Sequence, residues 1–213
     1  VKNDVYQTLP LYSNLKTKGI YVYPTNIDVA NASATINVES EVRNESGTDQ
    51  NVYLEVAVVN HLGELAYNFT SPLYTVTAAT DLDQDYLTVV PADAYASNQA
   101  AIDTTSREVT VIKASADVAE LNLWSVDDPY LYQVFCILRD ETGEAIDASQ
   151  ITTGFRKVEL VSGYDGGVFI NDQHVWLRGY AQRATNEWAA IGVAPDWLKD
   201  FDAQLIRESN ANF

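Results

Sequence analysis

The sequence contains no methionine, one cysteine and two histidines in 213 positions. The cysteine, Cys136, cannot form a disulfide within the chain, so a disulfide scaffold is excluded and a small buried core residue is the simplest interpretation. The histidines, His61 and His174, are far apart in the sequence, and there is no HExxH motif, cysteine pair or GxSxG elbow. The sequence therefore gives no support to a zinc site or a serine triad, and no metal or cofactor is predicted.

Long apolar runs are also missing. No stretch approaches the roughly 18 residues that a membrane-spanning helix needs, and no charged and then apolar signal sequence opens the chain. Membrane insertion is therefore not expected. Since the chain lacks an initiator methionine, we interpret it as a piece of a longer protein or a processed form, and the missing signal then says little about the compartment.

Positive charge is scarce. The chain has 13 basic against 30 acidic residues, a net charge of −17. Such a chain repels phosphate backbones and anionic membrane surfaces, which disfavours nucleic acid as a partner. Hydrophobic residues make up 46% of the sequence, enough for a sizeable core.

The first three quarters of the chain carry the alternating pattern of half-buried strands. Residues 34–42 place Ala34, Ile36, Val38, Ser40 and Val42 on one side, and the stretch that starts at Asn51 repeats the pattern with Val52, Leu54, Val56 and Val58. The stretches 44–50, 61–64 and 140–144 are turn signals. Further strands are predicted at 19–24, 107–113, 130–139 and 145–151. Short strands at this spacing predict an antiparallel β-sandwich of immunoglobulin type, with the polar residues 69–105 as a long loop or extra edge strands.

The pattern changes after about residue 160. Residues 162–167 are a glycine-containing break, and a short hairpin is predicted around Asn171 and Asp172, followed by a strand at 175–180. One helix is predicted over 195–208, because Pro195 suits a first turn and Trp197, Leu198, Phe201 and Leu205 fall on one face. A strand, a loop, a helix and a strand opening at 211–213 would form the first βα unit of an α/β domain.

Three motifs come in the order and approximate spacing of glycoside hydrolase family 2, which includes β-galactosidases, β-glucuronidases and β-mannosidases. They are LWSVDDPYLY at 123–132, GFRKVEL at 154–160 and the GG-x-F-x-N-x5-L-R-G pattern from Gly166 to Gly179. The chain resembles this family from about residue 20 onward. The resemblance implies that residues 1–18 are a linker or the tail of a preceding sugar-binding domain, 19–160 an immunoglobulin-like sandwich, and 161–213 the start of an incomplete (β/α)8 barrel.

The motifs also have a structural interpretation. Pro129 holds Asp128 extended, and Trp124, Tyr130 and Tyr132 are bulky enough to fill the seam between two domains. GFRKVEL connects the last sandwich strand to the next domain, with Arg156 and Lys157 solvated or paired across the interface. Neither motif is expected to carry catalysis.

The loop after Gly179 is the predicted functional element, because barrel enzymes build their sites at the carboxyl ends of strands. The common family pattern there is Arg-Gly-Val-Asn-(Arg or Lys)-His-Glu. This sequence keeps Arg178 and Gly179 and then departs from the pattern, which indicates a divergent branch. Candidate substrate-binding residues are the polar and aromatic ones that follow: Gln182, Arg183, Asn186, Glu187 and Trp188. Rim salt bridges and packing are the alternative role for this group.

The resemblance implies retaining hydrolysis of O-glycosyl bonds by two glutamates, with a β-galactosidase-like activity. The matching glutamate motifs are absent, and Glu187 and Glu208 fit neither, so no catalytic residue is assigned and the fragment alone is expected to be inactive. The alternative is a non-catalytic carbohydrate-binding or adhesion sandwich. The expected partner is a β-linked glycoside or polysaccharide. Self-association through the incomplete barrel segment is a further expectation, and by analogy the compartment would be a bacterial periplasm or cell surface.

Overall fold

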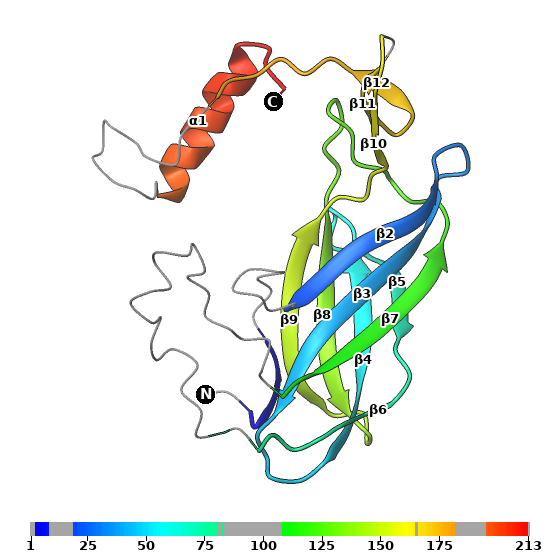
Figure 1. The fold of residues 1–213 in the computed structure, drawn as a ribbon, viewed down its shortest axis with the longest axis vertical. Coiled ribbons are helices and arrows are strands. Elements are labelled where there is room, and N and C mark those ends of the chain that lie inside the picture. Colours follow the sequence, from blue (N-terminus) through cyan, green and yellow to red (C-terminus); the bar gives the residue numbers. More distant parts are fainter. Residues whose placement is uncertain are drawn as a thin grey trace. The chain divides into compact units, whose positions relative to one another are not determined.

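The computed structural model describes residues 3–8, 19–80, 82, 108–164, 166–181 and 195–212. The chain divides into two units. The sandwich unit comprises Val1–Trp124 and Pro129–Arg156, and the C-terminal unit comprises Ser125–Asp128 and Lys157–Phe213. Most described elements are antiparallel strands, as the sequence predicts (Figure 1).

The first sheet of the sandwich unit is built around one long strand, β3. Its strands are β1 (Val5–Gln7), β2 (Ile20–Asp28), β3 (Ser33–Asn44) and β7 (Thr110–Val118). Strand β7 pairs with one edge of β3, and β2 and β1 pair in succession with the other edge. Figure 1 shows β2, β3 and β7 side by side.

The second sheet is built around β4. Its strands are β4 (Gln50–Val59), β5 (Leu65–Thr70), β6 (Tyr74–Val76), β8 (Tyr132–Asp140) and β9 (Ala145–Thr153). Their order is β5-β4-β8-β9, and the short β6 extends the β5 edge of β4. The two sheets form the antiparallel immunoglobulin-type sandwich that the strand spacing predicts. Strand β6 lies within the 69–105 stretch and is an edge strand, which is one of the two alternatives predicted for that stretch. Residues 81 and 83–105 lie outside the described part.

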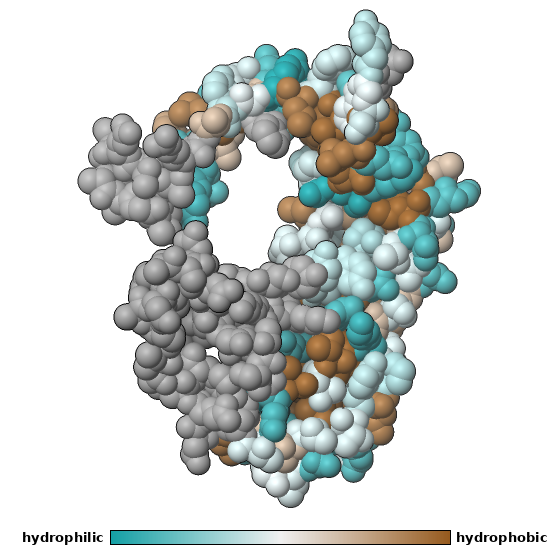
Figure 2. Space-filling view, viewed as in Figure 1, coloured by the Kyte–Doolittle hydropathy of each residue, from teal (hydrophilic) through white to brown (hydrophobic). Residues whose placement is uncertain are grey.

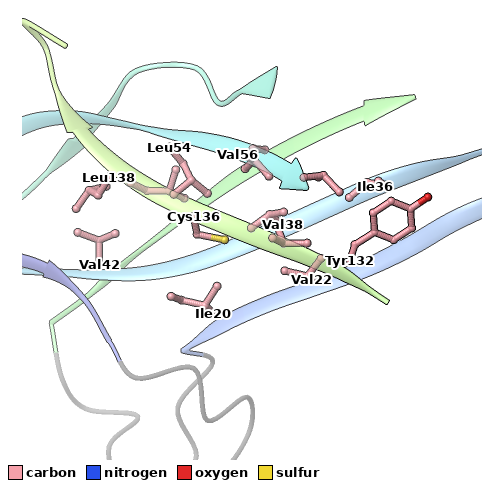
Figure 3. Close-up of a cluster of buried hydrophobic side chains, with 14 of the residues drawn as sticks. Ile20, Val22, Ile36, Val38, Val42, Leu54, Val56, Tyr132, Cys136 and Leu138 are labelled. Carbon is pink, nitrogen blue, oxygen red and sulfur yellow. The ribbon is translucent and has the colours of Figure 1, made fainter. Parts of the chain in front are cut away.

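The core lies between the sheets and follows the predicted alternation. Val52, Leu54, Val56 and Val58 of β4 are fully buried, and the predicted inward face of β3 is buried as well. Figure 3 shows how side chains from β2, β3, β4 and β8 meet in this layer. Since burying one such side chain stabilises a fold by about 1.5–3 kcal/mol, the alternation is the main determinant of the sandwich.

A buried polar bridge joins the two sheets at Gln7. Its Nε2 donates to the carbonyl of Cys136 on β8 at 3.0 Å, and its Oε1 accepts from the hydroxyl of Ser40 on β3 at 2.9 Å. The backbone N–H of Gln7 donates to a carboxylate oxygen of Asp147 on β9 at 2.7 Å. Strand β1 therefore belongs to the sandwich, which corrects the expectation that all of residues 1–18 are linker or tail.

The aromatic residues of the 123–132 motif also pack differently from the prediction. Tyr132 is 2% exposed and lies in the sandwich core beside Phe155, with ring centroids 5.5 Å apart. Trp124 packs over Gly154, where an added Cβ would lie 2.7 Å from the indole, and the Arg156 guanidinium lies 4.5 Å from the indole centroid. These contacts all fall within the sandwich unit, so Tyr132 serves its core and not a seam between domains.

The C-terminal unit contains a small sheet and one helix. Its elements are β10 (Val158–Val161), β11 (Gly167–Ile170), β12 (Gln173–Val175) and α1 (Asp196–Glu208). The strand order is β10-β11-β12. Because β10 pairs with β11, the boundary between the units falls after Arg156 and not after residue 160 as predicted. Hydrophobic surface gathers over this sheet in Figure 2, where Val158, Leu160 and Val161 are about half exposed or more.

Candidate functional site

The β11–β12 hairpin positions the start of the predicted functional loop. Its two turn residues, Asn171 and Asp172, have φ values of 50° and 63°, the left-handed pair that a tight type I′ hairpin requires. Asn171 and Lys157 exchange hydrogen bonds at 2.9 and 3.0 Å, and the Lys157 ammonium lies 2.6 Å from an oxygen of Asp172 and 3.1 Å from one of Glu159. The hydrogen bonds from Asp172 and Glu159 raise the pKa of Lys157. The predicted hairpin is confirmed, and Lys157 fastens it to β10.

Three aromatic rings form a row along this hairpin. His174 makes edge contacts with Phe169 and Trp176, at centroid distances of 5.1 and 4.7 Å. The imidazole lies so close to Gly167 that a Cβ there would be 2.3 Å from Nε2. A side chain at position 167 would displace the imidazole, so the glycine leaves room for the row of rings.

Residues 176–181 leave the hairpin as a segment held by Asn212. The Asn212 N–H donates to the Arg178 carbonyl at 2.7 Å, and its Oδ1 accepts from the Arg178 N–H at 2.8 Å. Its Nδ2 donates to the Trp176 carbonyl at 3.0 Å. The predicted strand at 175–180 does not continue beyond Val175. Asn212 is the one described residue that hydrogen-bonds to the backbone of this segment, and a strand needs a longer series of backbone hydrogen bonds.

Helix α1 follows the predicted bounds closely. The Pro195 carbonyl accepts from the N–H groups of Leu198 and Lys199, and the Lys199 ammonium lies 2.6 Å from Asp196. The hydrogen bond from Lys199 lowers the pKa of the Asp196 carboxyl. Of the predicted apolar face, Leu198 is buried, whereas Trp197, Phe201 and Leu205 are 47–61% exposed. The helix is 13 residues long, and no helix of the described part is long and apolar enough to cross a bilayer.

A hollow of about 320 Å³ lies between the end of the 176–181 segment and the helix. It is lined by Tyr180, Ala181, Asp202, Leu205 and Ile206. Asp202, Leu205 and Ile206 are spaced i, i+3 and i+4 and therefore lie on one face of the helix. This spacing can be seen in the sequence, but the prediction applied it to a neighbouring face. The hollow therefore begins where the predicted loop begins.

The predicted binding residues themselves are Gln182, Arg183, Asn186, Glu187 and Trp188. All five lie outside the described residues. Glu208, the other glutamate considered for catalysis, accepts a hydrogen bond from Gln204 at 2.8 Å at the end of α1. Among the described residues no group of three His, Cys, Asp or Glu side chains could hold a metal ion.

Comparison with known proteins decides the family. Residues 18–156 match the model of the family described as Glycosyl hydrolases family 2. The chain belongs to glycosyl hydrolase family 2. Over 99% of its length it is 31% identical to a β-glucuronidase of Formosa agariphila, of which it covers 18%. A β-galactosidase of Alteromonas mediterranea is 28% identical over 48% of the chain, which covers 9% of that enzyme.

Solved structures agree with this family 2 assignment. A β-glucuronidase of glycoside hydrolase family 2 superposes on all of the chain with a TM-score of 0.75 at 27% identity, and the chain covers 19% of it. A Bacteroides uniformis β-glucuronidase superposes with a TM-score of 0.72 at 20% identity, a likeness that concerns the fold alone. The chain thus spans about a fifth of the length of the relatives that it matches throughout.

Proposed function

We propose that the protein containing this chain is a retaining β-glycosidase that hydrolyses O-glycosyl bonds. The observation that carries the proposal is the extent of the family likeness. The family model covers the sandwich unit, and the matching β-glucuronidases cover the C-terminal unit as well. In a protein that used only the sandwich, the C-terminal unit would have no counterpart in the hydrolases.

We favour a β-glucuronide as the substrate. A relative at 31% identity and a structure at 27% identity that match the chain throughout are both β-glucuronidases. A β-galactoside is the second candidate, because several β-galactosidases match about half of the chain at 28–35% identity. A β-glucuronide differs from a β-galactoside by a carboxylate at C6 and by the opposite configuration at C4, and the carboxylate calls for a cationic group in the pocket.

Within this chain the loop after Gly179 would contribute to the sugar pocket. Gln182, Arg183, Asn186 and Glu187 would bind hydroxyl or carboxylate groups, and Trp188 would stack on a sugar face. Support comes from the chain order, since the loop follows the first segment of the proposed barrel, at the end where barrel enzymes place their sites. The hollow beside Tyr180 starts at the same point.

The chain's own role would be structural support and one wall of the pocket. A retaining mechanism uses an acid and a nucleophile whose carboxyl groups lie about 5–5.5 Å apart. We place both outside this chain, with residues 157–213 as the first βα unit of the catalytic barrel, and we expect the chain alone to be inactive. Self-association through the incomplete barrel segment stays a prediction.

The proposal is tested with the full-length protein and a panel of 4-nitrophenyl β-D-glycosides. We expect release of 4-nitrophenol from the glucuronide, with the galactoside slower, and a higher KM for the Trp188→Ala variant than for the wild type. Hydrolysis of the galactoside alone would replace the substrate assignment. No hydrolysis of any member, with binding of the same sugars retained, would favour the non-catalytic module.

A further inference from the structure

A second hollow in the C-terminal unit lies at the opposite end of the 176–181 segment from the predicted loop. Its volume is about 210 Å³. The residues that line it come from the 125–128 loop, the β11–β12 hairpin and the end of the chain, and those used here are Asp127, Gln173, His174, Trp176, Arg178 and Asn212. The hollow is thus made by three stretches that are distant in sequence.

The lining offers several polar groups that no other described side chain or backbone group bonds to. Within the described part of the chain, the side chains of Asp127, Gln173, His174 and Arg178 have no hydrogen bond or ion pair. Together they supply a carboxylate acceptor, a guanidinium with several donors, and an amide that does both. Asn212 differs from them, because its side chain is fully engaged with the backbone of the 176–178 stretch.

An aromatic wall completes the hollow. Trp176 is 76% exposed, and its indole makes an edge contact with His174 at 4.7 Å. Gly167 leaves room for the His174 imidazole at this place. The indole presents an apolar face for the C–H groups of a pyranose ring, and the polar groups beside it present donors and acceptors for its hydroxyls.

The charges of the lining select among ligands. The opposite charges of Asp127 and Arg178 cancel, and the chain as a whole carries −17. An anionic ligand would gain from the Arg178 guanidinium but would meet both the Asp127 carboxylate and the negative field of the protein. A neutral polyhydroxylated ligand faces neither penalty.

The geometry points to a second, non-catalytic site that binds a neutral pyranose between the 125–128 loop and the β11–β12 hairpin. Trp176 stacks on the sugar, and Asp127, Gln173 and Arg178 bind its hydroxyls. The site lies at the start of the segment whose other end leads to the predicted catalytic loop. It would let the enzyme hold a neutral stretch of a polysaccharide while another part of the chain is cleaved.

The test uses the full-length protein, with calorimetric titration of methyl β-D-galactopyranoside and of methyl β-D-glucuronide. The catalytic pocket is first blocked by a covalent cyclophellitol aziridine. We expect the neutral sugar to bind the blocked protein, and Trp176→Ala to weaken this binding by about tenfold, the upper range of an aromatic contact. Asp127→Asn should weaken it less, whereas Tyr164→Ala, which removes a fully exposed aromatic in the β10–β11 connection outside the hollow, should not.

Two results would overturn the site. One is no residual binding in the blocked protein. The other is binding by Trp176→Ala and Asp127→Asn that equals binding by Tyr164→Ala, with circular dichroism showing all three folded. Tighter binding of the glucuronide than of the galactoside would overturn the neutral ligand. If the aziridine does not label the protein, that result counts against the glycosidase proposal and not against the second site. The sugar titration is then carried out on the unlabelled protein.

Discussion

Asn212 holds Arg178 with its backbone and its side chain at once. The Asn212 N–H donates to the Arg178 carbonyl at 2.7 Å, and the Asn212 Oδ1 accepts from the Arg178 N–H at 2.8 Å. The Asn212 side chain thereby accepts a hydrogen bond that a backbone carbonyl of a neighbouring strand would otherwise accept. This arrangement joins the end of α1 to the segment that leads into the predicted loop.

Replacing Asn212 with alanine should loosen that segment. Two side-chain hydrogen bonds are lost, to Arg178 and to Trp176, which at roughly 0.5–1.5 kcal/mol each amounts to about 1–3 kcal/mol in the free energy of local opening. Amide exchange in peptides covering 176–181 of the full-length protein should then be about 5–150 times faster. Gln204→Ala, which removes one exposed side-chain bond within α1, is the control. Equal exchange in both variants would contradict the role of Asn212.

A second prediction concerns the polar bridge between the sheets. Gln7→Ala leaves the Ser40 hydroxyl and the Cys136 carbonyl without this partner in a buried position, so we expect a loss of about 1–3 kcal/mol in the free energy of unfolding of the sandwich. The measurement is urea denaturation of the full-length protein, followed by amide exchange in β1, β3 and β8. Gln50→Ala is the matched control, since that amide bonds only to neighbours in an exposed turn. A Gln7 variant as stable as the Gln50 variant would disprove the bridge.

The third prediction is a pH dependence from Glu55. Hydrogen bonds from Arg139 and from Asn68 lower the pKa of the Glu55 carboxyl below its ordinary value of 4.5. Because the folded pKa is lowered, the stabilisation is present above pH 4.5 and is lost as the pH falls through the lowered pKa. Glu55→Gln should remove this part of the acid sensitivity in thermal melts between pH 6 and pH 3, a range of about three units around the glutamate pKa. Parallel pH profiles for the wild type and the variant would refute it.

The only cysteine should be inert in the folded protein. Burial raises the pKa of the Cys136 thiol to about 12, and its side chain is fully buried. Since the thiolate is the reactive form, iodoacetamide at pH 8, about four units below that pKa, should leave the Cys136 peptide unlabelled by mass spectrometry. The same peptide should label fully in urea, which serves as the control. Rapid labelling of the native protein would show that the core opens at β8.

The sandwich could be predicted from the sequence because its strands obey a period of two. Val52, Leu54, Val56 and Val58 alternate with polar residues, and the structure buries all four. The hairpin at Asn171 and Asp172 was predictable for a similar local reason, since both residue types tolerate positive φ.

Other features depend on contacts that no local pattern records. Strand β1 has three residues, and its place in the sheet depends on Gln7 reaching Ser40, Cys136 and Asp147 across the fold. The position of the unit boundary depends on β10 pairing with β11. Residues 176–180 have the composition of a strand, yet among the described residues Asn212 is the one that hydrogen-bonds to their backbone.

For the candidate site, the sequence predicts a loop whose binding residues lie outside the described part, but it does not predict the hollows beside it. Tyr180 and Asp202 come together only because the chain returns through α1, a distance of about twenty residues in sequence. Asp127 and Trp176 are further apart still. Such pairings become visible only in the folded chain.

The most direct test of the central claim is the stereochemistry of hydrolysis by the full-length protein. Proton NMR of the reaction with 4-nitrophenyl β-D-glucuronide should show the β anomer of glucuronic acid first, with the α anomer appearing later by mutarotation, because retaining enzymes invert the anomeric carbon twice. Initial formation of the α anomer would contradict a retaining mechanism. No hydrolysis of this or any other β-glycoside of the panel by the folded protein would contradict the assignment as a β-glycosidase.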